Sequence, residues 1–481
     1  MPVLPSRAYD RPMLDSRIKT IAEAIVASGG RPVAVGGFVR DLCLGNDAKD
    51  MDIEVFGLAL EDLEGVLTRF GRVRRVGRAF GVLRLDGAGV HAEFSLPRRD
   101  SKRGPGHRGF DVQVDPGLDF AEAARRRDLT INSMGMELPG GKILDPHGGR
   151  RDLERRILRA TDTATFPEDP LRGLRVAQFC ARLDMTPDEE LVRLCGQLEL
   201  AEISPERKRE EFRKLLLRGV RPALGLAFLR RSGLLGHFPE LAALVDVPQD
   251  PRWHPEGDVW THTLMVVDEA AMLRTGDEDE DAALMFGALC HDFGKPLVTL
   301  TTDGGTVRSP RHSEAGIAPT RTFLDNLRTS HALVKRTCAL VRHHLAPAQF
   351  VAQGAGDRAY RRLARKLAAD GVTMELLVRT ARADHFGRTT EEALARSFSE
   401  GDRFLARARA LAVADRSPPN AVLGRHLIAR GLKPGADFSD VLRRCRAVQD
   451  AHGWSDPDRI LDAVLGASTN PEAAPGTPEP Q

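Results

Sequence analysis

The hydrophobic pattern of the chain changes character near residue 150. Before that point, residues 33–35 form a short apolar run, and residues 51–56 and 91–96 alternate apolar and polar side chains, which is typical of strands. Residues 59–70 repeat apolar side chains at helical spacing. The first part of the chain is therefore predicted to be mixed α/β.

Beyond residue 150 the pattern is helical almost throughout. Helices are predicted in seven segments, residues 171–183, 205–217, 223–234, 265–273, 282–290, 332–343 and 374–383. Breaks rich in proline, aspartate and glycine at 145–149 and 247–257 mark two boundaries. The expected division is a head (1–150), a helical neck and body (151–245), a second helical domain (246–395), a helical tail (396–465) and a disordered end (466–481).

Composition limits the class of protein. The chain has 481 residues, 42% of them hydrophobic and 29% charged, with a formal net charge of +2. That balance excludes a strongly basic coating protein but not a local basic groove. No uncharged apolar run reaches the ~18 residues of a membrane span, and no signal peptide is recognised. The six cysteines contain no C-x-x-C pair, so we expect a reducing, cytoplasmic location.

The most informative stretch runs from Gly36 to Asp52. Gly36 and Gly37 follow an apolar run, where the lack of a side chain lets backbone N–H groups approach a phosphate. Arg40 could grip a triphosphate through its planar guanidinium. Asp50 and Asp52 lie two positions apart on a predicted strand, so both carboxylates face one side. Two Mg²⁺ ions need such converging hard oxygen ligands.

This ordered set resembles the signature of the polymerase-β-like nucleotidyltransferases, in the branch of the tRNA nucleotidyltransferases and poly(A) polymerases. The resemblance covers roughly residues 30–395 and implies a mixed-sheet head in which Asp50 and Asp52 bind Mg²⁺. It also implies a third carboxylate at Glu93, which would bind metal or deprotonate the attacking hydroxyl. Glu54, on the same strand face as Asp52, is the alternative.

Two further stretches follow the order of the family. Residues 98–107 are basic and glycine-rich and resemble its flexible loop, although a hairpin connection explains their spacing equally well. In residues 125–132, the resemblance implies that Arg127 and Asp128 help to hold the nucleotide and that Asn132 lies nearby.

By the same resemblance, Asp169 and Arg172 select the base. They lie three positions apart and can project from one helix face, and their donors and acceptors can match the Watson–Crick edges of C and A, as in bacterial-type (class II) enzymes. Arg175 would lie one turn further on, near the phosphates. Asp169 before Pro170 also fits a plain helix N-cap. Gln178 replaces an Arg that close relatives often carry, which would weaken phosphate binding by one charge.

A basic helix is expected in the neck and body. It begins at Pro205 and carries Arg207, Lys208, Arg209, Arg213, Lys214 and Arg218. These side chains could contact tRNA phosphates. A solvated face interleaved with glutamates explains the same pattern, so both interpretations remain open.

A second constellation lies in residues 246–395. His262, the adjacent pair His291 and Asp292, and Asp384 lie at the ends of three separate predicted helices, so imidazole and carboxylate ligands could converge on one divalent metal. The pattern resembles the HD-domain phosphohydrolases, which implies that these four residues bind a divalent transition metal. The implied ligands of a second ion are His312 and His344.

These patterns predict a bacterial-type tRNA nucleotidyltransferase with an HD domain at 246–395. Its partners would be tRNA, CTP and ATP, without a membrane. Alternatives with the same head are a CC-adding, A-adding or poly(A)-forming enzyme. An HD phosphohydrolase with a nucleotide-sensing head is disfavoured by the intact Asp50 and Asp52, and a noncatalytic RNA-binding protein would not need two metal constellations.

Overall fold

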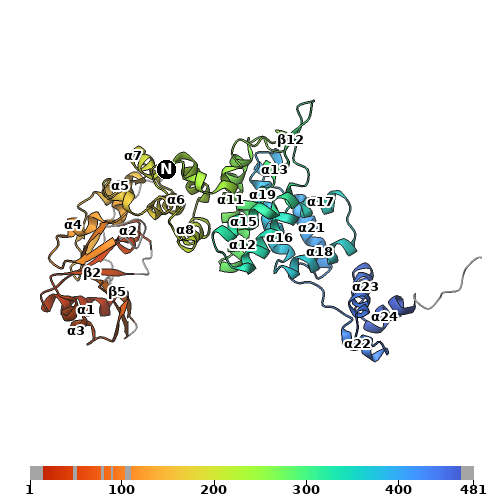
Figure 1. The fold of residues 1–481 in the computed structure, drawn as a ribbon, viewed down its shortest axis with the longest axis horizontal. Coiled ribbons are helices and arrows are strands. Elements are labelled where there is room, and N and C mark those ends of the chain that lie inside the picture. The colour runs from red at the N-terminus through yellow and green to blue at the C-terminus, as the bar shows by residue number, and fades with distance from the viewer. Residues whose placement is uncertain (1–14, 47–50, 77–80, 88–89, 103–109, 467–481) are drawn as a thin grey trace, which may run out of the picture. The chain divides into compact units, whose positions relative to one another are not determined.

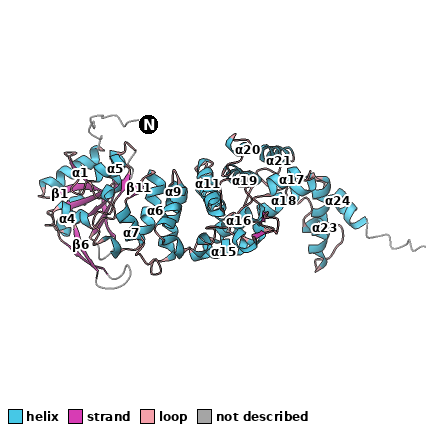
Figure 2. Cartoon of the chain, turned by 90° about the horizontal axis from the view of Figure 1, so that it is seen from above, coloured by secondary structure: helices cyan, strands magenta, loops and turns pink. Residues whose placement is uncertain are grey.

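The computed structural model describes residues 15–46, 51–76, 81–87, 90–102 and 110–466. The chain splits into two compact units, residues 1–239 and 240–481, which are considered one at a time (Figure 1). Figure 2 shows that the strands gather in the first unit, with only the short pair β12 (Leu300–Thr301) and β13 (Val307–Arg308) described in the second.

The first unit is built on a seven-stranded sheet in the order β3-β4-β5-β2-β1-β8-β9. Its strands are β1 (Arg31–Val35), β2 (Asp52–Phe56), β3 (Arg72–Val76), β4 (Val82–Gly87), β5 (Val90–Ser95), β8 (Gly135–Glu137) and β9 (Ile143–Leu144). The neighbours β2 and β5 run parallel, and the other neighbouring pairs are antiparallel. Only the first residues of β1 and β2 are exposed, because these strands lie at the centre of the sheet.

Helices cover this sheet and connect its strands. The helix α1 (Ser16–Ala27) packs on β1 and lies beside α3 (Leu60–Leu67), as Figure 1 shows. The helices α2 (Gly37–Cys43) and α4 (Phe120–Arg125) precede β2 and β8. The predicted strands and α3 are present close to their expected bounds, whereas α1 was not predicted.

The basic stretch 98–107 begins as a hairpin strand. Residues Arg98–Lys102 form β6, which pairs antiparallel with β7 (Phe110–Val114). Residues 98–102 are therefore a strand of a hairpin and not its connection, and the rest of the stretch, 103–107, lies outside the described residues.

The rest of the first unit is helical. It contains α5 (Gly149–Arg155), α6 (Leu171–Leu183), α7 (Glu189–Cys195), α8 (Pro205–Arg218) and α9 (Pro222–Arg231). The helices α8 and α9 both pack on α6. The approach of α9 is close, because a Cβ at Gly225 would lie 2.4 Å from the carbonyl oxygen of Ala177, so only glycine fits there.

The second unit is a helical domain around α12 (Glu278–Cys290). Every residue of α12 from Asp281 to Cys290 is buried, as expected for a helix that is apolar on all sides. Its contacts are α11 (Val259–Met272), α16 (His331–His343) and α19 (Met374–Phe386), which surround it in Figure 1. The other helices of eight or more residues before residue 420 are α15 (Ile317–Asn326), α18 (Asp357–Ala369) and α21 (Ser399–Ala410). The short helices are α13 (Lys295–Val298), α14 (His312–Ala315), α17 (Ala346–Ala352) and α20 (Glu391–Leu394).

Three final helices have an apolar cluster of their own. They are α22 (Gly424–Ala429), α23 (Asp437–His452) and α24 (Pro457–Leu465), and their shared core includes Leu427, Cys445 and Ile460. The prediction of a mixed α/β head followed by helices is thus confirmed, and all seven predicted helices are present. Among the described residues, no helix combines the length and apolar content needed to cross a bilayer.

Candidate active site and metal centre

A cavity of about 1110 Å³ opens in the first unit where β1 ends and β2 begins. Its lining includes Gly36, Gly37, Arg40, Asp52, Arg127, Asp128, Asn132, Asp169, Arg172 and Arg175. The structure thus brings together every residue expected at the nucleotide site except two. Asp50 lies outside the described residues, and Glu93 lies on the neighbouring strand β5.

Gly36 is required by the backbone at the mouth of this cavity. It is the N-cap of α2 and has a φ of 73°, a left-handed conformation that favours glycine. A Cβ at this position would lie 3.1 Å from Nη1 of Arg127. The absence of a side chain therefore lets an arginine reach the turn that follows β1.

The acidic residues of the head have different environments. Asp52 begins β2 and is exposed, and the parallel register of β2 and β5 places it opposite Glu93, which is also exposed. Glu54 is completely buried, with Oε1 2.9 Å from Arg126 Nη2 and Oε2 3.6 Å from Arg127 Nη2. Glu54 therefore neutralises two arginines, whereas Glu93 stands beside Asp52 as a third metal ligand would.

A hydrogen-bond chain links the predicted nucleotide-binding residues. Arg175 Nε donates to Asp128 Oδ2 at 2.7 Å, and Asn132 Nδ2 donates to Asp128 Oδ1 at 3.0 Å. Arg40 Nη1 then donates to Asn132 Oδ1 at 2.7 Å. The pKa of Arg175 is raised because the Asp128 carboxylate stabilises its positive charge. Asp128 is thus an anchor that orients the donors around the cavity.

Asp169 and Arg172 line the cavity and are also fixed by hydrogen bonds to other parts of the first unit. Asp169 Oδ1 accepts from the backbone N–H of Leu171 at 3.1 Å, so it caps the start of α6 as the simpler interpretation predicted. Its Oδ2 accepts from Arg207 Nη2 at 3.1 Å. The guanidinium of Arg172 donates to the carbonyl oxygens of Thr165, at 2.8 Å, and Arg126, at 2.6 Å.

Arg182, Arg207 and Lys214 are among the cations that line the cavity without having been predicted to do so. Arg207 and Lys214 extend from α8, and Arg182 lies one turn beyond Gln178 on α6. Arg182 Nη1 donates to Gln178 Oε1 at 3.1 Å, and Arg182 Cζ lies 5.8 Å from the centre of the Phe179 ring. The helical spacing from Arg175 to Arg182 is the sequence signal that could have identified Arg182.

The second unit brings the predicted HD residues together. His262 on α11 has Nε2 3.1 Å from Asp384 Oδ1 on α19. His291, at the end of α12, has Nε2 3.1 Å from Oδ2 of Asp292. The rings of His262 and His291 are 5.3 Å apart between centroids. Imidazoles and carboxylates from three helices therefore meet at one buried place.

The two remaining histidines meet beside Asp292. His312 Nε2 lies 3.3 Å from His344 Nε2 and 3.5 Å from Asp292 Oδ1. Burial lowers the pKa of His344 to about 3, so its imidazole is neutral at pH 7, the form that ligates metals. Asp292 thus faces a histidine of the first group and a histidine pair of a second group.

Unsatisfied buried atoms show that a cation fits this site. His291 Nε2 and both carboxylate oxygens of Asp292 are buried without an aligned hydrogen-bond partner among the described residues, although Lys295 Nζ lies 2.7 Å from Oδ2. The ligand atoms of His262, His291 and Asp292 lie within 4.8 Å of one another, as do those of Asp292, His312 and His344. Both groups therefore suit divalent metals.

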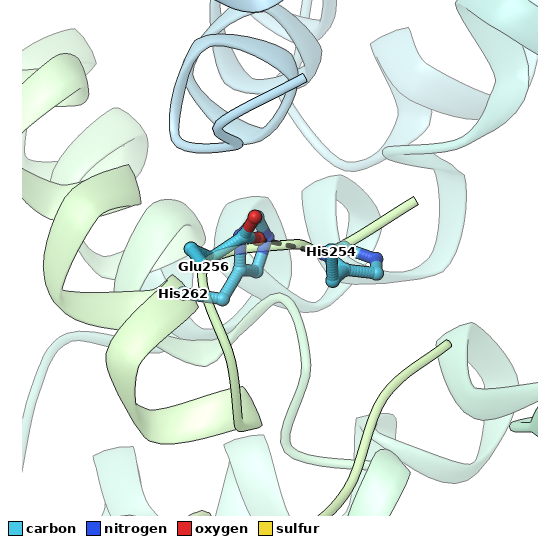
Figure 3. Close-up of side chains that lie close together, drawn as sticks. All are labelled: His254, Glu256 and His262. Carbon is cyan, nitrogen blue, oxygen red and sulfur yellow. Dashed lines mark hydrogen bonds and ion pairs between the residues drawn. The ribbon is translucent and has the colours of Figure 1, made fainter. Parts of the chain in front are cut away.

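Two residues just before α11, His254 and Glu256, join this centre, although the sequence pattern assigned neither of them a role. Figure 3 shows Glu256 between His254 and His262, and Glu256 Oε1 lies 2.9 Å from His254 Nδ1 and 2.8 Å from His262 Nδ1. His254 also lines a cavity of about 220 Å³ together with Trp253, Lys295 and Arg388.

Comparison with known proteins agrees with this arrangement. Residues 33–159 match the model of the poly A polymerase head domain, residues 189–244 match that of a probable RNA and SrmB binding site of polymerase A, and residues 259–417 match that of the HD domain. Among solved structures, the CCA-adding enzyme of Bacillus stearothermophilus in complex with CTP has a TM-score of 0.65 at 22% identity. The match between the two structures covers 94% of this chain and 97% of that enzyme's chain.

Two relatives are similar enough to establish the family. The multifunctional CCA protein of Methylococcus capsulatus is 40% identical over 321 residues, which are 64% of this chain and 71% of the relative. The multifunctional CCA protein of Stenotrophomonas maltophilia is 39% identical over 319 residues, 65% of this chain and 75% of the relative. The chain therefore belongs to the bacterial-type tRNA nucleotidyltransferase and poly(A) polymerase family with an HD domain, in the branch of the multifunctional CCA proteins.

Proposed function

We propose that this protein adds C and A nucleotides to the 3′ end of tRNA without a nucleic-acid template. The observation that carries the proposal is the exposed carboxylate of Asp52, which lines a cavity rich in arginine and lies opposite the exposed Glu93 of the neighbouring strand. The names of the relatives support the same activity, as does the similarity of the fold to a CCA-adding enzyme of Thermotoga maritima complexed with tRNA, at a TM-score of 0.59.

The head would perform the transfer. Asp52, with Asp50 and Glu93, would hold Mg²⁺, which when bound lowers the barrier to attack and neutralises developing charge. The tRNA 3′-hydroxyl attacks the α-phosphate of CTP or ATP, and a new P–O bond forms in line. The bond between the α-phosphorus and the oxygen that bridges to the β-phosphate breaks, and pyrophosphate leaves. Arg40 and Arg175, oriented through Asp128 and Asn132, would bind the phosphates.

Base choice would depend on Asp169 and Arg172. Both line the cavity, and contacts from α8 and the backbone fix them in place, so the base would meet a preformed edge of donors and acceptors. CC-adding, A-adding and poly(A)-forming enzymes would share these residues, and the product distinguishes them.

The HD domain would be a second, metal-dependent site that hydrolyses a phosphate ester. His262, His291, Asp292 and Asp384 would bind one divalent transition metal, and His312 and His344 would complete a second site beside Asp292. Such a metal supplies a bound hydroxide near neutral pH. Lys295 and Arg388, which line the adjacent cavity, would attract the phosphate.

The experiment uses the full chain with tRNA lacking its 3′ CCA, labelled CTP and ATP, and Mg²⁺. We expect ends that sequence as CCA. Ends that stop at CC, that gain only A on a CC-ended tRNA, or that carry a poly(A) run would replace the proposal with the corresponding enzyme. Absence of any incorporation, with intact nucleotide binding, would favour a nucleotide-sensing head instead.

A further inference from the structure

Three imidazoles of the HD centre share one arrangement. In His291, His312 and His344, ring atom Nδ1 hydrogen-bonds the backbone carbonyl oxygen three residues earlier. The acceptors are Ala288 at 2.8 Å, Ser309 at 2.9 Å and Val341 at 2.7 Å. An Nδ1 that donates carries the ring hydrogen, so the lone pair is left on Nε2, the atom that faces the other ligands.

Helix ends make two of these carbonyls available. The helix α12 ends at Cys290 and α16 ends at His343, so Ala288 and Val341 belong to the last turns. Carbonyls in a last turn have no N–H donor further along the helix, and side chains can satisfy them. The position of a histidine just past a helix end therefore fixes its tautomer without any further residue.

His262 Nδ1 makes a different contact. The residue lies in the first turn of α11, which begins at Val259, and the carbonyl of Val259 already accepts the hydroxyl of Thr263 at 2.8 Å. Instead, His262 Nδ1 lies 2.8 Å from Glu256 Oε1, within hydrogen-bonding distance; the contact is not well aligned, and this buried atom has no other hydrogen-bond partner among the described residues. Gly257, with a φ of 123°, lets the chain turn so that Glu256 folds back onto the helix that follows it.

The Glu256 carboxylate is itself fixed. Its Oε1 accepts from His254 Nδ1 at 2.9 Å, and its Oε2 accepts from the backbone N–H of Thr389 at 3.1 Å. Thr389 follows α19, the helix that carries Asp384. Only 1% of the Glu256 side chain is exposed, so the carboxylate cannot swing into solvent. On the other side of the ring, His262 Nε2 lies 3.1 Å from Asp384 Oδ1.

We infer that Glu256 is a positioning residue that accepts the Nδ1 hydrogen of His262 and presents Nε2 of that ring to the first metal of the HD centre. The inference rests on the proposed metal site. The rival is a separate ion held by His254, Glu256 and His262, whose ligand atoms also lie within 4.8 Å of one another. Ligands about 2.1 Å from a tetrahedral ion lie about 3.4 Å apart, so the observed 2.8 and 2.9 Å fit hydrogen bonds better.

The test compares metal affinity among variants of the full chain, stripped with a chelator and titrated with Co²⁺ by calorimetry, with the visible spectrum of the bound ion as a second readout. Glu256→Leu keeps the volume but accepts no hydrogen bond, and we expect affinity for the first Co²⁺ to fall about 100-fold. Glu256→Gln keeps an acceptor without charge and should lose about 10-fold. The matched control is Glu269→Leu on α11, the helix that follows Glu256, where Glu269 pairs only with Arg396 at 2.7 Å among the described residues.

The outcomes separate this inference from the proposed function. Wild-type affinity in Glu256→Gln would overturn the inference, and this variant decides the question if Glu256→Leu does not fold. Loss of one whole ion from the stoichiometry would also overturn it, because Glu256 would then be a ligand. An equal loss in Glu269→Leu would show a general stability effect. If the wild-type chain itself binds no Co²⁺, the proposed HD site fails and the inference falls with it.

Discussion

Asp169 stabilises the fold and is also proposed to choose the base, and two substitutions can separate these roles. One carboxylate oxygen caps α6 through the N–H of Leu171, and the other pairs with Arg207, about one third exposed. Removing both contacts in Asp169→Ala should cost about 1 kcal/mol for the cap and about 0–1 kcal/mol for the ion pair. Asp169→Asn keeps the cap, since Asn caps helices as well as Asp, and should lose less than about 1 kcal/mol.

Selectivity should respond differently. In the proposed function, the carboxylate of Asp169 offers only acceptors to the base, and Asn replaces one acceptor with a donor. A mismatched buried partner costs about 1–3 kcal/mol, so discrimination of CTP and ATP against GTP and UTP should fall about 5- to 150-fold in both variants. The assay is kcat/KM for each nucleotide on tRNA lacking CCA, alongside urea unfolding.

The control is Asp188→Ala, because Asp188 caps α7 at 2.8 Å and pairs with Arg159 at 2.7 Å but does not line the nucleotide cavity. It should lose similar stability and keep wild-type selectivity. If Asp169→Asn were as selective as the wild type, the base-reading role would be refuted and the cap would explain the residue fully.

Three other substitutions test neighbouring steps of the argument. Glu54→Gln should lower the free energy of unfolding by about 3–5 kcal/mol, because it removes the buried negative charge that faces Arg126 and Arg127; a stable variant lacking only Mg²⁺ binding would instead make Glu54 a metal ligand. Arg182→Ala should raise KM for ATP about 10- to 150-fold with little change in kcat, and an unchanged KM would remove it from the phosphate site. His291→Ala should abolish hydrolysis of phosphate esters, measured on a panel of monoesters and cyclic phosphates, and leave CCA addition intact, whereas Asp52→Ala should do the reverse; loss of both activities in either variant would contradict separate sites.

The sequence predicted the parts of the site that are short and local. Gly36, Asp52, Asp169 and the pair at His291 could be recognised because their chemistry depends on neighbours within a few positions. The strands and most long helices followed from periodicity, and α1 was missed although Ile18, Ile21, Ala22 and Ile25 give it a buried face.

Contacts between distant segments were beyond that reasoning. Glu54 and Arg126 lie 72 positions apart, so their ion pair could not be inferred from alternation along β2, which allowed Glu54 as a metal ligand. Glu256 was visible in the sequence, but its role depends on the turn at Gly257 and on the N–H of Thr389 from another helix. Side-chain partners of this kind are determined by tertiary packing.

The way α12 and α16 end has a consequence for how this domain can change in length. Because terminal carbonyls aim the rings of His291 and His344, one residue inserted into or removed from either last turn would rotate its histidine by about 100° about the helix axis. Substitutions there can preserve the ring direction, but insertions and deletions cannot. We therefore expect length variation among homologues to spare these two helix ends and to accumulate in connections such as the β12–β13 hairpin, where Leu300 is 48% exposed.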